Sequence, residues 1–191
     1  MSNVRPHKHN HMRLLLAFPI IVALASCANP LNDATAARYS AQCGAAESAN
    51  NLALAEEACY RAVKNADWGN LSPDLKSQHL YNFARVKRRL AKFSEAEKLL
   101  NESLGIEEPL SGASSVKVGR RLVELSVNLA AQDKWSEGEV SIMRVVPIAP
   151  NFAGAERSYT REVFLNYAAT LQERGSNSAS SSLKAAAAAL K

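Results

Sequence analysis

His79 is the residue that could most readily serve catalysis, because it is the single histidine beyond residue 26. A Ser–His hydrolase would need it to accept the proton of a serine hydroxyl. The sequence has no Gly-x-Ser-x-Gly turn, no His-Glu-x-x-His pair and no Gly-rich phosphate loop. Acidic pairs such as Glu56-Glu57 and Glu107-Glu108 are interpreted as solvated helix ends or faces. The sequence therefore predicts no catalytic or metal site. His79 is interpreted as a polar residue of the surface or of a groove, and a hydrolase that uses it stays an alternative.

The first 26 residues have the three zones of a removable export signal. Residues 1–13 are polar and carry only basic charge, and residues 14–25 form an apolar run. That run is too short to cross roughly 30 Å of hydrocarbon as a helix, and Pro19 weakens it further. The closely spaced His7, His9 and His11 resemble a metal-binding tract, but they fall in this segment and would be lost with it.

The end of this segment, Leu24-Ala25-Ser26-Cys27, resembles the lipobox of bacterial lipoproteins. The resemblance implies that residues 1–26 are a lipoprotein signal peptide and that Cys27 becomes the first residue of the mature chain. Its thiol would carry a diacylglyceryl group and its new amino group an acyl chain, with no other cofactor. Several acyl chains anchor a protein stably. Ala28 in place of Asp after the cysteine implies the outer membrane, with the protein facing the periplasm.

Charge and cysteine content constrain the remainder of the chain. The net charge of +5 falls to about +2 without Arg5, Lys8 and Arg13, which is too little to predict a nucleic-acid partner. Acylation of Cys27 would leave Cys43 and Cys59 as a pair. In the oxidising periplasm they either form a disulfide or stay buried as two thiols, and the disulfide is the favoured interpretation. No Cys-x-x-Cys motif indicates redox activity.

Beyond a tether at residues 27–33, apolar residues return every three or four positions, which predicts an all-α domain over residues 34–191. Pro and Gly mark the breaks, at Pro109, Gly112, Pro147 and Pro150. The expected helices cover residues 34–48, 51–66, 74–90, 93–106, 115–132, 135–146, 155–174 and 179–190. The last, Ala-rich segment is either a capping helix or a frayed tail.

These helices form pairs that repeat. One pair reads Leu80-x-x-Phe83-Ala84 followed by Phe93-x-x-Ala96-x-x-x-Leu100, and Trp135 stands in the slot of Phe93, 42 residues later. The pattern resembles the tetratricopeptide repeat (TPR), whose usual length is about 34 residues. The resemblance implies a short right-handed α-solenoid of about four TPR-like helix pairs, with longer loops than usual. An unrelated helical bundle is the alternative.

In the TPR family the first helix of each pair lines a concave groove that binds a protein or peptide. Carried over to this sequence, the resemblance gives these groove candidates: Tyr81, Asn82, Arg85, Arg88, Arg89, Arg120, Val123, Glu124, Val127, Leu165 and Asn166. Several belong to the basic run at residues 85–92, which is either a solvated helix face or a patch for an acidic partner. Arg–carboxylate contacts and packing on Tyr81 would then hold the partner.

The sequence as a whole favours an outer-membrane-anchored periplasmic lipoprotein that acts as a non-enzymatic scaffold in envelope assembly. Its partners would be an envelope protein or peptide in the groove and the membrane through the lipid. A structural envelope lipoprotein without a specific client is the second interpretation, and the His79 hydrolase is the third.

Overall fold

The computed structural model describes Met1 and residues 29–190. The expected signal peptide beyond Met1, and Cys27, lie outside these residues. The described part contains eight α-helices, one short 3₁₀ helix and no strand, which confirms the all-α prediction. The helices are α1 (Pro30–Ser48), α2 (Leu52–Trp68), α3 (Pro73–Arg89), α4 (Phe93–Ser111), α5 (Val116–Ala130), α6 (Trp135–Val145), α7 (Gly154–Glu173) and α8 (Asn177–Ala189), with the 3₁₀ turn η1 (Ala149–Asn151) before α7.

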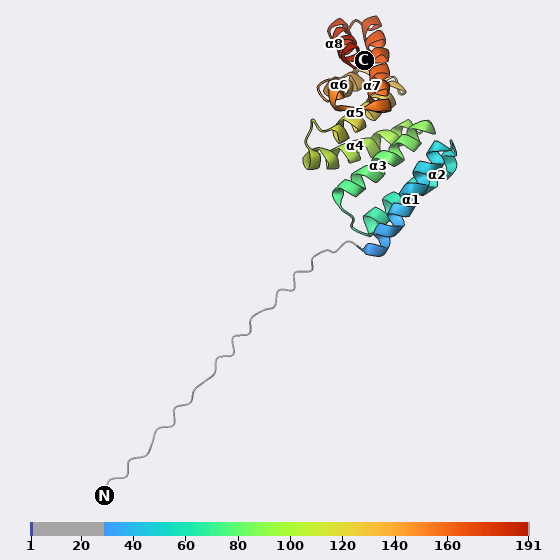
Figure 1. Cartoon of the computed structure of the whole chain (residues 1–191), viewed down its shortest axis with the longest axis vertical. Coiled ribbons are helices and arrows are strands. Elements are labelled where there is room, and N and C mark those ends of the chain that lie inside the picture. The colour runs from blue at the N-terminus through green and yellow to red at the C-terminus, as the bar shows by residue number, and fades with distance from the viewer. Residues whose placement is uncertain (2–28, 191) are drawn as a thin grey trace.

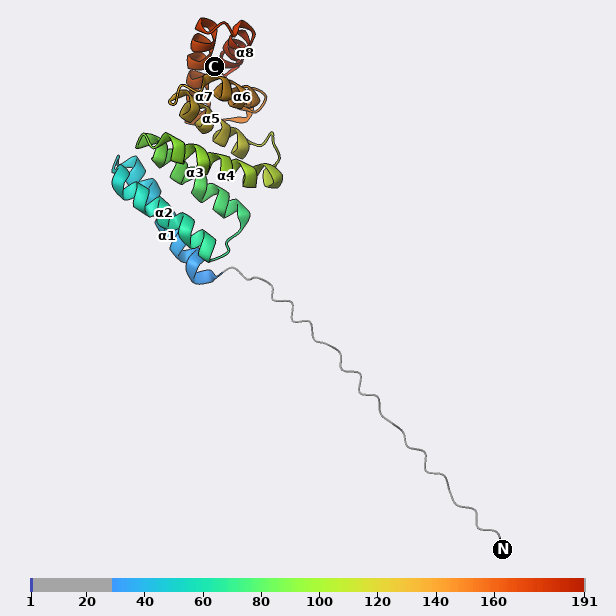
Figure 2. The same ribbon diagram turned by 180° about the vertical axis from the view of Figure 1, so that it is seen from behind.

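Consecutive helices pack as four antiparallel pairs, and the pairs stack into an elongated array (Figure 1). The first pair, α1 and α2, lies at one end of the array, and α7 and α8 lie at the other (Figure 2). The second helices begin at Leu52, Phe93, Trp135 and Asn177, at intervals of 41, 42 and 42 residues. Phe93 and Trp135 therefore occupy equivalent places, as the repeat pattern predicted.

The turn inside every pair has the same backbone geometry. Its left-handed residue is Asn50, Ala91, Asp133 or Gly175, with φ of 56°, 57°, 59° and 85° in that order. In the second pair, Ala91 donates its N–H to the Arg88 carbonyl, and the next residue, Lys92, donates to the Lys87 carbonyl. The same two bonds recur in the other three turns, and they satisfy carbonyls that the helix end leaves free. The repeat therefore includes the turns as well as the helices.

Two helix boundaries, the start of α1 and the end of α4, differ from the expectation by more than two residues. Helix α1 begins at Pro30, because the Asn29 side chain accepts a hydrogen bond from the Leu31 amide at 3.0 Å and caps it. The end of the expected tether, residues 30–33, is therefore helical. Helix α4 continues through Pro109 to Ser111, although an end near residue 106 was expected. Pro109 stands in the last turn, where its missing N–H costs the helix a single bond, to Gly105.

The C-terminal segment is the second helix of the fourth pair, not a frayed tail. Leu183 and Ala187 of α8 are buried in the main core. The Ser180 hydroxyl donates to the Ala168 carbonyl of α7 at 2.7 Å. An Ala-rich face suits this position because small side chains let the two helices approach closely.

Cys43 of α1 and Cys59 of α2 are joined by a disulfide, with their Cα atoms 5.1 Å apart. Both residues are buried in the apolar cluster that also holds Phe83. The bond ties the two helices of the first pair together at the end of the array, where only one neighbouring pair supports them.

Candidate functional site: a groove across the first helices

One face of the array holds a groove of about 640 Å³ built mainly from the first helices of the four pairs. Helix α1 contributes Glu47, and Phe152 comes from the segment before α7. The remaining lining residues are Gln78, Tyr81, Asn82, Arg85, Arg88 and Arg89 of α3, Arg120, Val123 and Glu124 of α5, and Ala155, Glu156, Tyr159 and Thr160 of α7. Its volume is within the range of sites that hold a small ligand or a short peptide segment.

Eight of the eleven groove candidates lie on this surface: Tyr81, Asn82, Arg85, Arg88, Arg89, Arg120, Val123 and Glu124. The other three do not. Val127 is half-buried and packs against the main core, whereas Leu165 and Asn166 are exposed on α7 outside the groove.

Leu165 and Asn166 of α7 lie outside the groove for a geometric reason. The groove uses the C-terminal part of α3, the middle of α5 and the N-terminal part of α7, so it crosses the helices diagonally. Successive pairs in a solenoid are rotated relative to one another, and a straight path across them meets each helix at a different height. Residues at the same position of the repeat, such as Tyr81 and Leu165, therefore do not share one surface.

The arginines of the groove are already paired with glutamates from neighbouring repeats. Arg85 of α3 contacts Glu47 of α1 at 2.9 Å. Arg88 of α3 is paired with Glu124 of α5. These pairs compensate most of the positive charge, so the groove is not the open arginine cluster that the sequence suggested.

Arg120 continues the series, because its Nη2 lies 3.0 Å from Glu156 of α7. Each of these contacts joins the first helix of one pair to the first helix of the next. The chain of pairs holds the groove in shape and presents both charge signs to a ligand.

The basic run at residues 85–92 is likewise not a solvated helix face. Lys87 is buried and its Nζ lies 2.6 Å from both Glu56 and Glu95. Lys92 also contacts Glu56, at 2.6 Å. Hydrogen bonds from the two lysines, with burial opposing them, hold the pKa of the Glu56 carboxyl below its usual value. The run therefore fastens the second repeat to the first.

Tyr81 lines the groove, and two guanidinium groups lie near its ring. Its ring centre is 5.7 Å from Arg85 and 5.2 Å from Arg121, within the range of cation–π contacts. Burial raises the pKa of Tyr81 to about 12, and burial also raises the pKa of Tyr159 across the groove. Both phenols therefore stay neutral at physiological pH.

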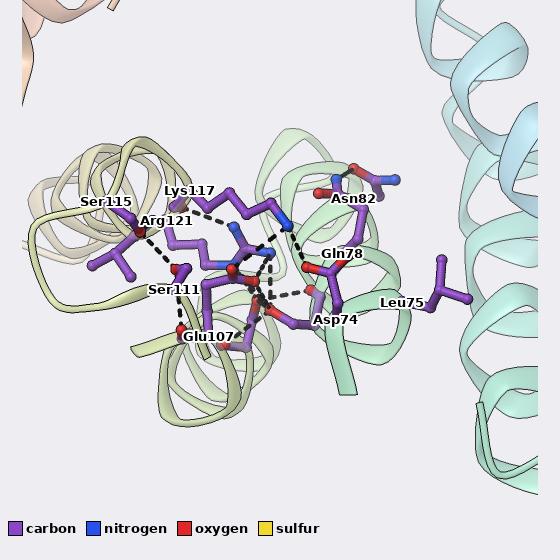
Figure 3. Close-up of polar contacts among 12 residues, drawn as sticks. Asp74, Leu75, Gln78, Asn82, Glu107, Ser111, Ser115, Lys117 and Arg121 are labelled. Carbon is purple, nitrogen blue, oxygen red and sulfur yellow. Dashed lines mark hydrogen bonds and ion pairs between the residues drawn. The ribbon is translucent and has the colours of Figure 1, made fainter. Parts of the chain in front are cut away.

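Arg121, which packs on the Tyr81 ring, belongs to a buried polar network. The network connects α3, α4 and α5, and Figure 3 shows Glu107 and Arg121 within it. Arg121 is 1% exposed, and its Nη2 lies 3.0 Å from Oε2 of Glu107, which is fully buried. Ser77 donates its hydroxyl to Glu107 at 2.9 Å, and Arg121 donates to Ser103 at 2.7 Å. The interpretation of Glu107 as a solvated residue is therefore wrong, although its neighbour Glu108 does lie at the surface and pairs with Arg144.

The spacing of the charged residues in the sequence already indicates this network, although residues 107 and 108 were interpreted as a solvated acidic pair. Arg121 is spaced with Val118, Leu122 and Leu125 on the apolar face of its helix. Glu107 and Ser103 fall on the apolar face of α4 in the same way, beside Leu100 and Leu104. A charged residue of each sign at core spacing on two consecutive helices indicates a buried pair.

His79 is buried and does not line the groove. Burial lowers its pKa, and its Nδ1 has no hydrogen-bond partner among the described residues. The expectation that His79 is a surface or groove residue is therefore wrong, and no nucleophile is paired with its Nδ1. The described residues also contain no cluster of His, Cys, Asp and Glu side chains that could hold a metal ion. None of the helices described is both long enough and apolar enough to cross a membrane.

The stacked pairs with their common turn and first-helix groove define a short α-solenoid of TPR-like hairpins. No protein-family model and no curated protein sequence matches the chain. Among solved structures, BtubC (BKLC) from P. vanneervenii superposes with a TM-score of 0.72 at 20% identity over 83% of this chain. The match takes in 64% of BtubC, so this chain spans less than two thirds of its length.

A second similar structure is a putative kinesin light chain from Podosopora anserina with nearly identical TPR-like repeats. It matches with a TM-score of 0.61 at 17% identity, over 80% of this chain and 74% of that one. A substituted variant of the same kinesin light chain gives a TM-score of 0.62 at the same identity. At these identities the likeness establishes the TPR-like fold.

Proposed function

We propose that this chain is an outer-membrane-anchored periplasmic lipoprotein whose TPR-like domain binds a protein partner during envelope assembly. The observation that carries the proposal is the groove itself. It combines an apolar floor at Tyr81, Val123 and Phe152 with paired charges along its walls. A concave surface with aromatic anchors and a polar rim suits a protein segment better than a flat face does.

The paired charges indicate what kind of segment fits. Because Arg85, Arg88 and Arg120 already have carboxylate partners, an acidic ligand would have to displace Glu47, Glu124 or Glu156. A segment of mixed character can instead place apolar side chains on the floor. Its backbone groups can then bond to the amides of Gln78 and Asn82, which join each other at 2.9 Å.

Two features support the proposed location. The sequence around Cys27 resembles a lipobox, and Ala28 favours transfer to the outer membrane. The disulfide between Cys43 and Cys59 suits an exported protein, because structural disulfides persist in the periplasm and are rare in the cytosol.

Photo-cross-linking in the cell tests the groove. Probes would replace Asn82, Val123 and Tyr159 in the groove, and Leu110 and Val140 as exposed control positions on second helices. We expect one dominant envelope protein to be captured at the groove positions and not at the controls. The same diffuse background at both sets would contradict the proposal and favour a structural lipoprotein without a specific client.

The anchor has its own test. The Cys27→Ala variant cannot form the thioether, so we expect it to remain as an unlipidated, uncleaved precursor. Mass spectrometry of the N-terminal peptide would check this. Normal processing and membrane attachment of the variant would exclude the lipoprotein assignment.

A further inference from the structure

The end of the array where the described helices begin carries two large apolar side chains that the fold leaves uncovered. Trp68, the last residue of α2, is 73% exposed, and Leu31, in the first turn of α1, is 76% exposed. Leu54 and Tyr60 of α2 are less exposed, at 42% and 45%, and both cysteines of the first pair are buried. An exposed Trp beside an exposed Leu is a feature of surfaces that contact a partner or a membrane.

Leu31 and Trp68 belong to one surface because the ends of α1 and α2 are held together. The Asn29 amide donates a hydrogen bond to the Gly69 carbonyl at 2.9 Å. The two helices approach so closely there that a Cβ on Gly69 would lie 2.6 Å from the Cβ of Asn32. Trp68 precedes Gly69, and Leu31 precedes Asn32. We refer to Leu31 and Trp68 as the apolar end.

The covalent chain limits the distance between the start of α1 and the proposed lipid anchor at Cys27. Asn29 is fixed twice, because its side chain caps α1 and its amide bonds to Gly69. Two peptide units separate it from Cys27, so their Cα atoms can be at most about 7.6 Å apart. An acylated Cys27 has its lipid chains in the bilayer. The start of α1 would then lie within the depth of the headgroup layer, given that interfacial segments bury about 5–10 Å.

We propose that the apolar end docks on the surface of the membrane that holds the lipid of Cys27, with Trp68 and Leu31 in the headgroup region. The inference rests on the proposed lipidation. The opposite end of the array, with α7 and α8, then points away from the membrane (Figure 1). Trp suits this place because its ring is apolar and its indole N–H bonds to polar headgroups.

The local charges fit a membrane contact that is driven by these two side chains and not by charge. Asp67, next to Trp68, is paired with Lys76 at 3.0 Å. Asp33, in the first turn of α1, adds a negative charge. The apolar end therefore has no excess of basic residues for anionic lipid, and burial of the Trp and Leu side chains must supply the free energy.

Fluorescence of the lipidated protein in vesicles tests the docking. The full mature lipoprotein would be purified from membranes and reconstituted into vesicles of phosphatidylethanolamine and phosphatidylglycerol. The spectrum of wild type minus that of Trp68→Phe gives the emission of Trp68 alone. This subtraction leaves the partly buried Trp135 untouched, and the exposed position 68 tolerates the change.

We expect the Trp68 emission to shift to shorter wavelength in vesicles relative to the spectrum of a soluble tryptophan analogue in buffer. We also expect it to be quenched when the lipids carry bromine near the headgroup. The matched control adds Val140→Trp to the Trp68→Phe background, since Val140 is 66% exposed on α6, far from the apolar end. Its emission should stay unshifted and unquenched.

Solvent-like, unquenched emission from Trp68 in protein that floats with the vesicles would overturn the docking and leave the lipoprotein proposal intact. Equal quenching at positions 68 and 140 would also overturn it, because the array would then lie on the membrane without a defined end. Protein that lacks lipid on Cys27 by mass spectrometry and does not float would overturn both proposals.

Discussion

Arg121 and Glu107 form an ion pair in which both side chains are withdrawn from water, with 3.0 Å between Nη2 and Oε2. The pair lies at the junction of the second and third repeats, directly behind Tyr81 of the groove. Each partner compensates a charge that would be costly to bury alone. The pair therefore holds two repeats in one relative position and supports the floor of the groove.

Removal of one partner of the buried Arg121–Glu107 pair should strongly destabilise the protein. We expect Arg121→Met to lower the free energy of unfolding by about 3–5 kcal/mol, because Glu107 is left buried and unpaired. Urea denaturation followed by circular dichroism measures this. The matched control is Arg174→Met, whose exposed pair with Asp133 should contribute less than about 1 kcal/mol. Equal, small losses for both variants would show that the buried pair is not formed.

The disulfide should stabilise the first repeat. Its loop of about 15 residues predicts a loss of about 3 kcal/mol when the bond is opened. We expect reductant to lower the urea midpoint of the wild type and to leave the Cys43→Ala/Cys59→Ala variant unchanged. An identical midpoint for the wild type with and without reductant would mean that the two cysteines are not bonded in solution.

Replacement of alanine by glycine should stabilise the protein at a left-handed turn residue and destabilise it inside a helix. Ala91 has a φ of 57°, which costs an L-residue about 1–2 kcal/mol, whereas Gly loses about 0.5–1 kcal/mol through chain entropy. Ala91→Gly should therefore stabilise the protein by about 0.5–1 kcal/mol. The control Ala41→Gly lies on the exposed face of α1 and should destabilise it by about 1 kcal/mol. Thermal unfolding of the two variants gives the signs directly, and a destabilised Ala91→Gly would contradict the shared turn geometry.

His79 should make stability depend on pH. Burial lowers its pKa in the folded state below the usual value of 6.5, so the unfolded chain binds the proton more tightly. The neutral His79 ring therefore leaves the folded state at its full stability above pH 6.5. This contribution to the free energy of unfolding is lost as the pH falls through the lower pKa of His79 in the folded state. Urea unfolding at about pH 7 and about pH 5 should show this loss in the wild type and a smaller one in His79→Gln. Equal pH dependence in both proteins would show that His79 is not buried as a neutral ring.

The hairpin architecture could be predicted from the sequence because it depends on local rules. Apolar spacing and helix-starting residues such as Ser72-Pro73 act within one repeat. The match between Phe93 and Trp135 then shows that the same local pattern recurs in the next repeat. The groove was predicted in part from the resemblance to the tetratricopeptide repeat, and Tyr81 and Val123, at equivalent positions of two first helices, do line it.

The rotation between repeats was decided only by the tertiary structure. It moves the fourth repeat's contribution to the groove from Leu165 to Tyr159, because the groove crosses the stacked helices diagonally. The pairing of charges also required the fold. Arg88 and Glu124 are 36 residues apart, and nothing local distinguishes such an arginine from a solvated one. Burial of Arg121 against Glu107 likewise depends on how α4 and α5 meet, so the sequence determined the helices and the stacking of the repeats determined the site.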